Sequence, residues 1–314
     1  MTLSLANPWD TLCDTLRTVQ GPAPPQSRLL SIDFEDWHQL VRRRVGAADW
    51  ETGGTALERQ TGALLELLQE LGARATFFVL GVSAQAHPRL VERIVAGGHE
   101  VASHGHSHTP VHAQSPGEFE RDLRQARHVI QELTGVTPVG YRAPAFSITT
   151  DSTWAYDVLA AEGFAYDSSQ HDSPRLHNRI RTQNGAPYRM ELPTATLWEF
   201  PVAVWRTPVG PVPVGGPSYW AVMPTRLVLH GLAQAGPLAG LYLHPQELDP
   251  EHLRAELPDG TSRRQRAHGA FRSAQRNLAR RRTATILRAI ARQHLLIPYG
   301  EAHAGLAHGA PAST

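Results

Sequence analysis

The sequence predicts an α/β fold built on a parallel sheet, and two observations support this. Between residues 28 and 167, short apolar segments rich in β-branched and aromatic residues alternate with longer segments whose apolar residues recur at helical spacing. Such alternation is typical of βαβ units, which form parallel sheets. In addition, reactive polar residues directly follow several apolar segments, and in a parallel α/β barrel these strand ends converge on one face.

The expected strands are short and mostly apolar. They cover residues 29–32, 75–80, 100–103, 139–142, 164–166, 198–204 and 238–243. The expected helices follow from leucine spacing and from end signals. Ser115 and Glu118 form a capping box ahead of one helix, and Gly135 closes it. The helices cover residues 56–71, 88–96, 115–133, 152–162 and 263–293, the last of which is basic and broken near Thr283.

Composition narrows the class of protein. The 314 residues carry a formal net charge of +1, so no strong field would attract nucleic acid. No apolar segment approaches the roughly 20 residues that span a bilayer, and no signal peptide is recognisable. The single cysteine, Cys13, cannot form an intrachain disulfide. A soluble, cytoplasmic protein is therefore expected, and its oligomeric state is not predicted.

Three segments are expected along the chain. Residues 1–26 form an N-terminal extension that ends in a turn rich in proline, residues 27–300 form the main domain, and residues 301–314 form a flexible tail. Arginine is concentrated between residues 263 and 292. This basic segment is either a solvated helix face or a contact surface for an anionic glycan, a nucleotide-linked sugar or a membrane.

Two histidines in the segment HGHSH, His104 and His108, are candidate metal ligands. They are four residues apart, so a helical turn would direct both at one point, and neutral imidazole is a common ligand of zinc and similar metals. The alternative is a polar loop without a metal.

Three carboxylates follow the first expected strand closely, at Asp33, Glu35 and Asp36. They repel one another unless a cation is near. One of them could complete a metal site with the histidines, and another could act as a general base on water. The alternative is an acidic turn that caps the next segment.

Arg142 and His244 also stand at ends of expected strands. An arginine can hold a carboxylate through paired hydrogen bonds, and backbone N–H groups after Pro144 could stabilise an oxyanion. A histidine beside a metal site can protonate a departing amine. The alternatives are a structural salt bridge for Arg142 and an ordinary core or surface histidine for His244.

Several segments together resemble the polysaccharide deacetylases with a NodB-homology domain (carbohydrate esterase family 4). The resemblance covers roughly residues 28–297 and lies in residues 31–37, 75–81, 97–108, 141–148, 154–169 and 241–245. Residues 198–204, residues 214–220 and the basic C-terminal helix resemble the branch found with exosortase-linked exopolysaccharide gene clusters.

The resemblance implies a distorted (β/α) barrel that binds a divalent metal, usually zinc, and hydrolyses N-acetyl groups of a carbohydrate. It implies that Asp33 is the catalytic base, that Arg142 orients it and that His244 is the general acid. It also implies that the backbone near Ala145 and Phe146 helps to form the oxyanion hole. A supporting role toward the acid is implied for Asp167.

The resemblance further implies that His104 and His108 bind the metal. The family's usual first motif has two adjacent aspartates, whereas Phe34 follows the first acid here. The third ligand is therefore Glu35 or Asp36: strand alternation favours Glu35, and a turn would favour Asp36.

Several aromatic residues are candidate sugar contacts, and two other functions fit the same motifs. Trp220 is a candidate sugar contact together with Trp198, Trp205 and Tyr219, although core packing explains these residues equally well. One rival function is an amidohydrolase of the same fold that acts on a small cyclic amide. Another is a carbohydrate-binding protein without catalysis.

Overall fold

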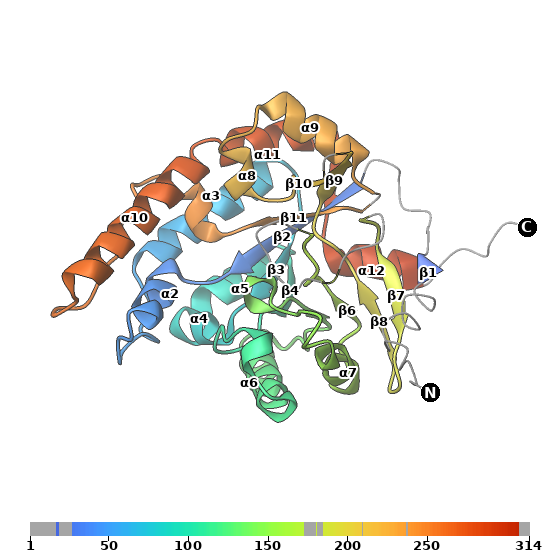
Figure 1. Cartoon of the computed structure of the whole chain (residues 1–314), viewed down its shortest axis with the longest axis horizontal. Coiled ribbons are helices and arrows are strands. Elements are labelled where there is room, and N and C mark those ends of the chain that lie inside the picture. Colours follow the sequence, from blue (N-terminus) through green and yellow to red (C-terminus); the bar gives the residue numbers. More distant parts are fainter. Residues whose placement is uncertain are drawn as a thin grey trace, which may run out of the picture.

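The structure is a computed structural model that describes residues 17–18, 27–172, 180, 185–208, 210–236 and 238–307. A curled, mostly parallel sheet forms its centre, and helices cover the outside of the sheet (Figure 1). The expected α/β fold, a distorted (β/α) barrel, is confirmed. None of the described helices combines the length and hydropathy that a membrane crossing needs.

Seven strands run parallel in the order β8-β6-β5-β4-β3-β2-β11. Their bounds are β2 Ser27–Phe34, β3 Thr76–Val79, β4 Glu100–Ser103, β5 Gly140–Tyr141, β6 Tyr166–Asp167, β8 Thr196–Glu199 and β11 Gly240–Leu243. The remaining strands of the sheet are β12 Leu295–Ile297, parallel to the start of β2, and the antiparallel strands β7 Tyr188–Glu191 and β1 Arg17–Thr18 beyond β8. Within the expected extension 1–26, only Arg17–Thr18 lie among the described residues.

The parallel part of the sheet curls so that the segment after β8 comes beside β11. The segment after β8 reaches β11, where Val202 and Gly240 form a single parallel bridge. The amide of Ala203 donates to the carbonyl of Gly240 at 2.8 Å, and the amide of Gly240 donates to Pro201 at 3.2 Å. The expected strand over 198–204 is therefore wrong in extent: β8 ends at Glu199, because the chain then crosses toward β11.

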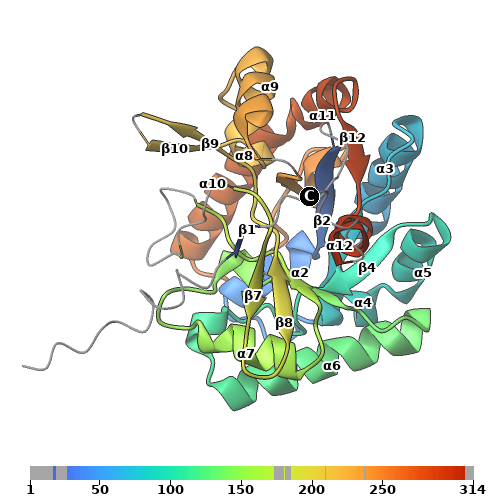
Figure 2. The same cartoon turned by 90° about the vertical axis from the view of Figure 1, so that its right-hand side faces the viewer.

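The helices flank these strands (Figures 1 and 2). They are α2 Trp37–Arg44, α3 Ala56–Glu70, α4 Gly81–Ala86, α5 Pro88–Ala96, α6 Pro116–Thr134, α7 Trp154–Ala161, α8 Pro217–Trp220, α9 Thr225–Gln234, α10 Arg263–Arg280, α11 Thr283–Ala291 and α12 Tyr299–Ala307. A separate hairpin pairs β9 Val204–Thr207 with β10 Gly210–Pro213. The capping box of Ser115 and Glu118 begins α6 as predicted, and the basic helix breaks between α10 and α11.

Strand alternation in β2 separates the core from the site. Leu30, Ile32 and Phe34 face outward into the cluster that packs against the helices, whereas Leu29 belongs to the inner cluster of the curled sheet. Asp33 has the same parity as Leu29, so its side chain points to the inner face. The carboxyl end of β2 thus places the buried carboxylate of Asp33 on the inner side of the sheet.

The flexible tail expected over residues 301–314 is wrong for residues 301–307, which are helical. Residues 301–307 belong to α12, whose Tyr299, Ala302 and Leu306 are buried in the inner cluster. The amide of Gly300 donates to Glu100 at 2.7 Å and anchors the start of the helix. These small and apolar residues form a helix because they pack against the curled sheet, and residues 308–314 lie outside the described part.

Candidate active site

Each of the strand-end residues expected to carry chemistry lies at the carboxyl edge of the sheet. Asp33 is the penultimate residue of β2, and His104, Arg142 and His244 directly follow β4, β5 and β11. Parallel strands bring these ends together. The structure accordingly places all four side chains within one network of contacts.

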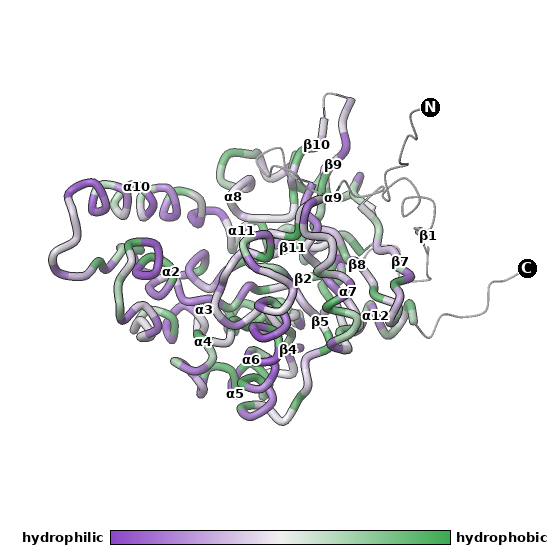
Figure 3. The backbone as a smooth tube through the Cα atoms, turned by 60° about the horizontal axis from the view of Figure 1, so that its bottom comes forward, coloured by the Kyte–Doolittle hydropathy of each residue, from purple (hydrophilic) through white to green (hydrophobic). Residues whose placement is uncertain are grey.

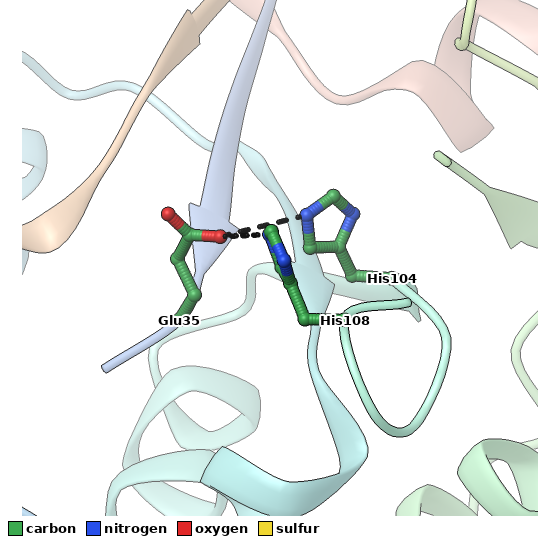
Figure 4. Close-up of side chains that lie close together, drawn as sticks. All are labelled: Glu35, His104 and His108. Carbon is green, nitrogen blue, oxygen red and sulfur yellow. Dashed lines mark ion pairs between the residues drawn. The ribbon is translucent and has the colours of Figure 1, made fainter. Parts of the chain in front are cut away.

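Glu35, His104 and His108 form a group that could hold a metal ion. One ligand atom of each lies within 4.8 Å of the others (Figure 4). The Nε2 atoms of His108 and His104 lie 2.9 Å and 3.8 Å from Glu35 Oε2. Burial opposes the charged form of Glu35, but the histidines around it outweigh burial and hold its pKa well below the usual range. Two imidazoles and one carboxylate are a donor set that suits a divalent metal.

The two histidines meet through a loop rather than through the helical turn that their spacing suggested. Residues 104–108 have no regular structure, and Gly105 and His108 adopt left-handed backbone conformations with φ of +73° and +56°. Asp122 of α6 fixes this loop, because its carboxylate accepts hydrogen bonds from the amides of His106 and Ser107 at 2.8 Å and 3.1 Å.

The other ring nitrogen of His104 is engaged by the backbone. Nδ1 lies 2.9 Å from the carbonyl oxygen of Arg142, so this nitrogen carries the hydrogen and donates it. The Nε2 lone pair therefore faces Glu35 and remains able to bind a metal. Hydrogen bonds of this kind orient metal-ligating histidines in proteins generally.

Asp36 does not join this group. Its carboxylate caps α2 by accepting the amide of His38 at 2.9 Å, and it also accepts the amide of Gly54 at 2.6 Å. The chain turns after Glu35 so that Asp36 faces the start of the helix. Of the two carboxylates considered as the third ligand, the structure brings Glu35 to the histidines.

Arg142 and Asp33 form a buried ion pair with 2.7 Å between Nη1 and Oδ1. The guanidinium is fully buried, and its remaining donors reach Ser31, Ser168 and Tyr299. Burial disfavours the charged guanidinium, yet the carboxylate of Asp33 and the hydroxyl of Tyr299 raise the pKa of Arg142. Arg142 is therefore a rigid cation that fixes the Asp33 carboxylate.

His244 lies between two groups of carboxylates. Its Nε2 is 3.5 Å from Glu35 and 4.0 Å from Asp33, and its Nδ1 is 3.4 Å from Glu247. Burial favours the neutral ring, but Glu247, Glu35 and Asp33 together raise the pKa of His244 to about 9. A histidine that is protonated near neutral pH and close to the metal group can give a proton to a departing amine.

The turn after Arg142 offers a backbone donor to the cavity. Ala145 and Phe146 both have left-handed backbone conformations with φ of +54°. The amide of Phe146 donates to the carbonyl of Ala143 at 3.0 Å, whereas the N–H of Ala145 has no backbone acceptor among the described residues. Ala145 is exposed at the cavity, so its amide can meet a bound oxyanion.

The supporting role expected for Asp167 toward His244 is wrong in this structure. Tyr166 belongs to the inner cluster, so Asp167 has the opposite parity and faces away from the inner side. It pairs in register with Glu199 of β8 and accepts from the hydroxyl of Ser169 at 2.6 Å. The carboxylate that faces Nδ1 of His244 is Glu247 instead.

The sugar contact expected for Trp220 is also wrong. Trp220 is fully buried in the outer core, and its Nε1 donates to the carbonyl of Val214 at 2.7 Å. Trp198 is likewise buried in the inner cluster. Core packing therefore explains both tryptophans.

A cavity of 540 Å³ adjoins the candidate site. It is lined by the turn after β5, by α2 and α10, and by the candidate site residues Asp33, Glu35, His104, His108 and His244. The side chains on these walls include Trp37, Phe146, Tyr242 and Arg272. A volume of this size suits a ligand of one or two sugar rings rather than a single small ion.

The sequence did not identify some residues of the site. The positions of Ser31 and Glu247 in the sequence could have predicted their place in the site. Ser31 shares strand parity with Asp33, and Glu247 lies three residues after His244. Ser168 and Tyr299 had none, since only the tertiary fold brings them to Arg142.

Comparisons with known proteins agree with this architecture. Residues 48–163 match the family model described as polysaccharide deacetylase, and residues 168–288 match a domain of unknown function, DUF3473. Both matches leave out Asp33 and Glu35. A crystal structure of a polysaccharide deacetylase candidate from Mycobacterium smegmatis superposes with a TM-score of 0.60 at 20% identity, over 95% of this chain and 98% of that one.

Curated relatives carry deacetylase names. A peptidoglycan deacetylase-like protein of Gibberella zeae is 31% identical over 147 residues, 45% of this chain and 43% of that protein. A chitooligosaccharide deacetylase of Rhizobium leguminosarum bv. trifolii is 40% identical over 100 residues, 32% of this chain and 44% of that protein. The chain spans less than half of the length of these relatives.

The curled parallel sheet with polar residues at its carboxyl edge places the protein in the α/β half-barrel class. Within that class, residues 48–163 match the polysaccharide deacetylase family, and the curated relatives carry deacetylase names.

Proposed function

We propose that this protein hydrolyses N-acetyl groups of a polysaccharide or oligosaccharide, in the synthesis or modification of an exopolysaccharide. The observation that carries the proposal is the joint position of the Glu35, His104 and His108 group and the Asp33–Arg142 pair in one cavity. The deacetylase names of the relatives support the reaction type. The DUF3473 match over 168–288 is consistent with the resemblance to exopolysaccharide-linked deacetylases.

The residues present fit a divalent metal, which we take to be zinc. Glu35, His104 and His108 would hold it, and His104 offers a free Nε2 because its Nδ1 donates to a backbone carbonyl. When bound, the metal would act as a Lewis acid and lower the pKa of water toward neutrality.

The side chains of this protein then have separate tasks. Asp33, fixed by Arg142, accepts a proton from the attacking water. The N–H of Ala145 donates a hydrogen bond to the oxygen that becomes negatively charged as the acetamide carbonyl is attacked. His244, protonated beside Glu247, gives its proton to the nitrogen of the departing amino sugar. The products are acetate and a free amine, and no covalent intermediate is needed.

Acetate release from a panel of N-acetylated oligosaccharides tests the proposal. Metal content is measured on the same protein, and the His104→Ala/His108→Ala variant serves as the control. We expect release that requires about one metal per chain and disappears in the variant. Bound metal without release from any sugar would favour the hydrolase of a small cyclic amide. Absence of both metal and release would favour a carbohydrate-binding protein.

A further inference from the structure

One wall of the cavity is strongly cationic. Arg44 of α2 and Arg272 and Arg276 of α10 line it, and we call these three residues the arginine wall. The two helices lie side by side, and hydrophilic residues recur along both of them (Figure 3). Gln265 of α10 donates to the carbonyl of Val45 at 3.3 Å, which ties the basic helix to the end of α2. The basic segment seen in the sequence is therefore in part a wall of the site.

The charges of the arginine wall are poorly balanced by protein carboxylates. Arg276 lies 3.3 Å from Glu247. Among the residues that the structure describes, neither Arg44 nor Arg272 has a carboxylate within 4.0 Å. Arg272 donates from Nη1 to Gln275 at 2.9 Å, and its buried Nε has no partner in the described part of the chain.

The three cations also repel one another. Burial lowers the pKa of Arg272, and the charges of Arg276 and Arg44 lower it further. A guanidinium remains charged under such conditions, so the repulsion persists in the folded protein. Like charges gathered in a cavity are unfavourable unless an anion joins them. The wall therefore has the properties of a site for an anion.

The arginine wall lies next to the proposed catalytic residues and is connected to His244 through Glu247. Arg276 contacts Glu247, which contacts His244, and the Arg276 guanidinium lies 5.5 Å from the ring centre of Trp37. The acids Asp33 and Glu35 line the same cavity. A ligand whose acetamide lies beside Asp33 and Glu35 can therefore place another part of itself against the arginine wall.

We propose that the arginine wall binds an anionic group of the substrate, so that the preferred substrate is an N-acetylated saccharide carrying a carboxylate or a phosphate on the acetylated sugar or its neighbour. Guanidinium groups bind both oxyanions through paired hydrogen bonds. The inference rests on the proposed deacetylase function and adds a substrate class to it.

Three probes test the inference with the full-length, metal-loaded protein. They are chitotetraose, which is neutral, a hyaluronan tetrasaccharide, which alternates glucuronate with N-acetylglucosamine, and N-acetylglucosamine 1-phosphate. Steady-state kinetics compare the native protein with Arg44→Gln and Arg272→Gln. Arg264→Gln is the matched control, because Arg264 is an exposed residue of the same helix that does not line the cavity.

We expect the native protein to prefer an anionic probe, and we expect either wall variant to raise KM for that probe about tenfold with little change in kcat. KM for chitotetraose and all constants of Arg264→Gln should stay unchanged. The probe that responds, carboxylate or phosphate, identifies the source of the anion. Equal or better turnover of chitotetraose, with no KM shift in the wall variants, would overturn the inference and leave the deacetylase proposal standing.

A binding measurement separates the two proposals if no probe releases acetate. Calorimetric titration of the same saccharides needs no turnover. Binding of an anionic probe that weakens about tenfold in Arg272→Gln but not in Arg264→Gln would support the arginine wall, even though the deacetylase proposal had failed. Equal binding by both variants, or no binding of anionic probes, would overturn it.

Discussion

The backbone carbonyl of Arg142 accepts the Nδ1 hydrogen of His104 at 2.9 Å, while the guanidinium of the same arginine holds Asp33 at 2.7 Å. One residue at the end of β5 thus fixes both the tautomer of a proposed metal ligand and the position of the proposed base. The side chain of Arg142 is fully buried and held by further hydroxyl groups, so both interactions are rigid. Binding of the metal and activation of water would depend on the same strand end.

Replacement of Asp33 by asparagine should abolish most turnover while the metal remains bound. The amide keeps the size of the carboxylate but cannot accept a proton, and general-base catalysis contributes about 10²–10⁴-fold. We expect a loss of kcat in that range, measured by acetate release, with unchanged zinc content. The matched control is Asp36→Asn, in the same acidic motif but at the cap of α2. A rate for Asp33→Asn within tenfold of native would show that another group is the base.

Replacement of Glu247 by glutamine should lower the pKa of His244 in the metal-free protein. Burial alone would favour the neutral ring, and the carboxylates beside it, Glu247 first among them, raise its pKa to about 9. Because this folded-state value exceeds the unfolded one, protonation of His244 stabilises the fold fully below about pH 6.5, and this contribution is lost as pH rises through about 9.

NMR titration of the His244 ring, assigned with His244→Gln, measures this shift directly. Glu256→Gln is the control, because it removes an exposed carboxylate beside His38 and should leave the pKa of His244 unchanged. An unaltered His244 pKa in Glu247→Gln would mean that Glu35 and Asp33 dominate the shift.

The strand-end residues could be predicted from the sequence because period-two alternation and parallel strands are local rules. Asp33, His104, Arg142 and His244 each lie at the carboxyl end of a strand, and a parallel sheet brings such ends together. The same alternation favoured Glu35, which the structure places beside the histidines.

Other features depend on tertiary contacts that the sequence does not specify. The sequence predicts a tail over residues 301–307, yet Leu306 packs into the inner cluster. Trp220 could have been a sugar contact or a core residue, and only the fold shows that Val214 accepts its N–H. The arginines of α10 form a wall of the cavity because α10 lies beside α2, and no local pattern predicts that placement.

Replacement of Glu199 by glutamine should reduce the loss of unfolding free energy that occurs as the pH rises. Burial raises the pKa of Glu199 well above its usual range, and the neighbouring Asp167 raises it further. A folded-state pKa above the unfolded value means that the protonated form stabilises the fold below about pH 4.3 and that this stability is lost as pH rises through the folded pKa. The neutral amide avoids that loss.

Urea unfolding at pH 4 and pH 8 tests this expectation. The free energy of unfolding of Glu199→Gln, relative to native, should rise by at least about 1 kcal/mol between the two pH values, since one pKa unit corresponds to about 1.4 kcal/mol. Glu191→Gln, an exposed carboxylate on the neighbouring strand β7, should show no such change. A constant difference for Glu199→Gln would contradict the raised pKa.

Replacement of Gly105 by alanine should weaken metal binding as well as stability. Gly105 has a φ of +73°, and a Cβ there would lie 2.7 Å from the Asp122 carboxylate that holds the loop between the two histidines. Gly98 has the same φ and open space around it, so Gly98→Ala is a matched control for backbone strain alone. Both variants should lose about 1–2 kcal/mol of unfolding free energy in urea. Only Gly105→Ala should also lose zinc affinity, about 10–100-fold in a competition titration, because the support of a metal ligand is displaced. Equal zinc affinity in the two variants would show that Asp122 does not position His108.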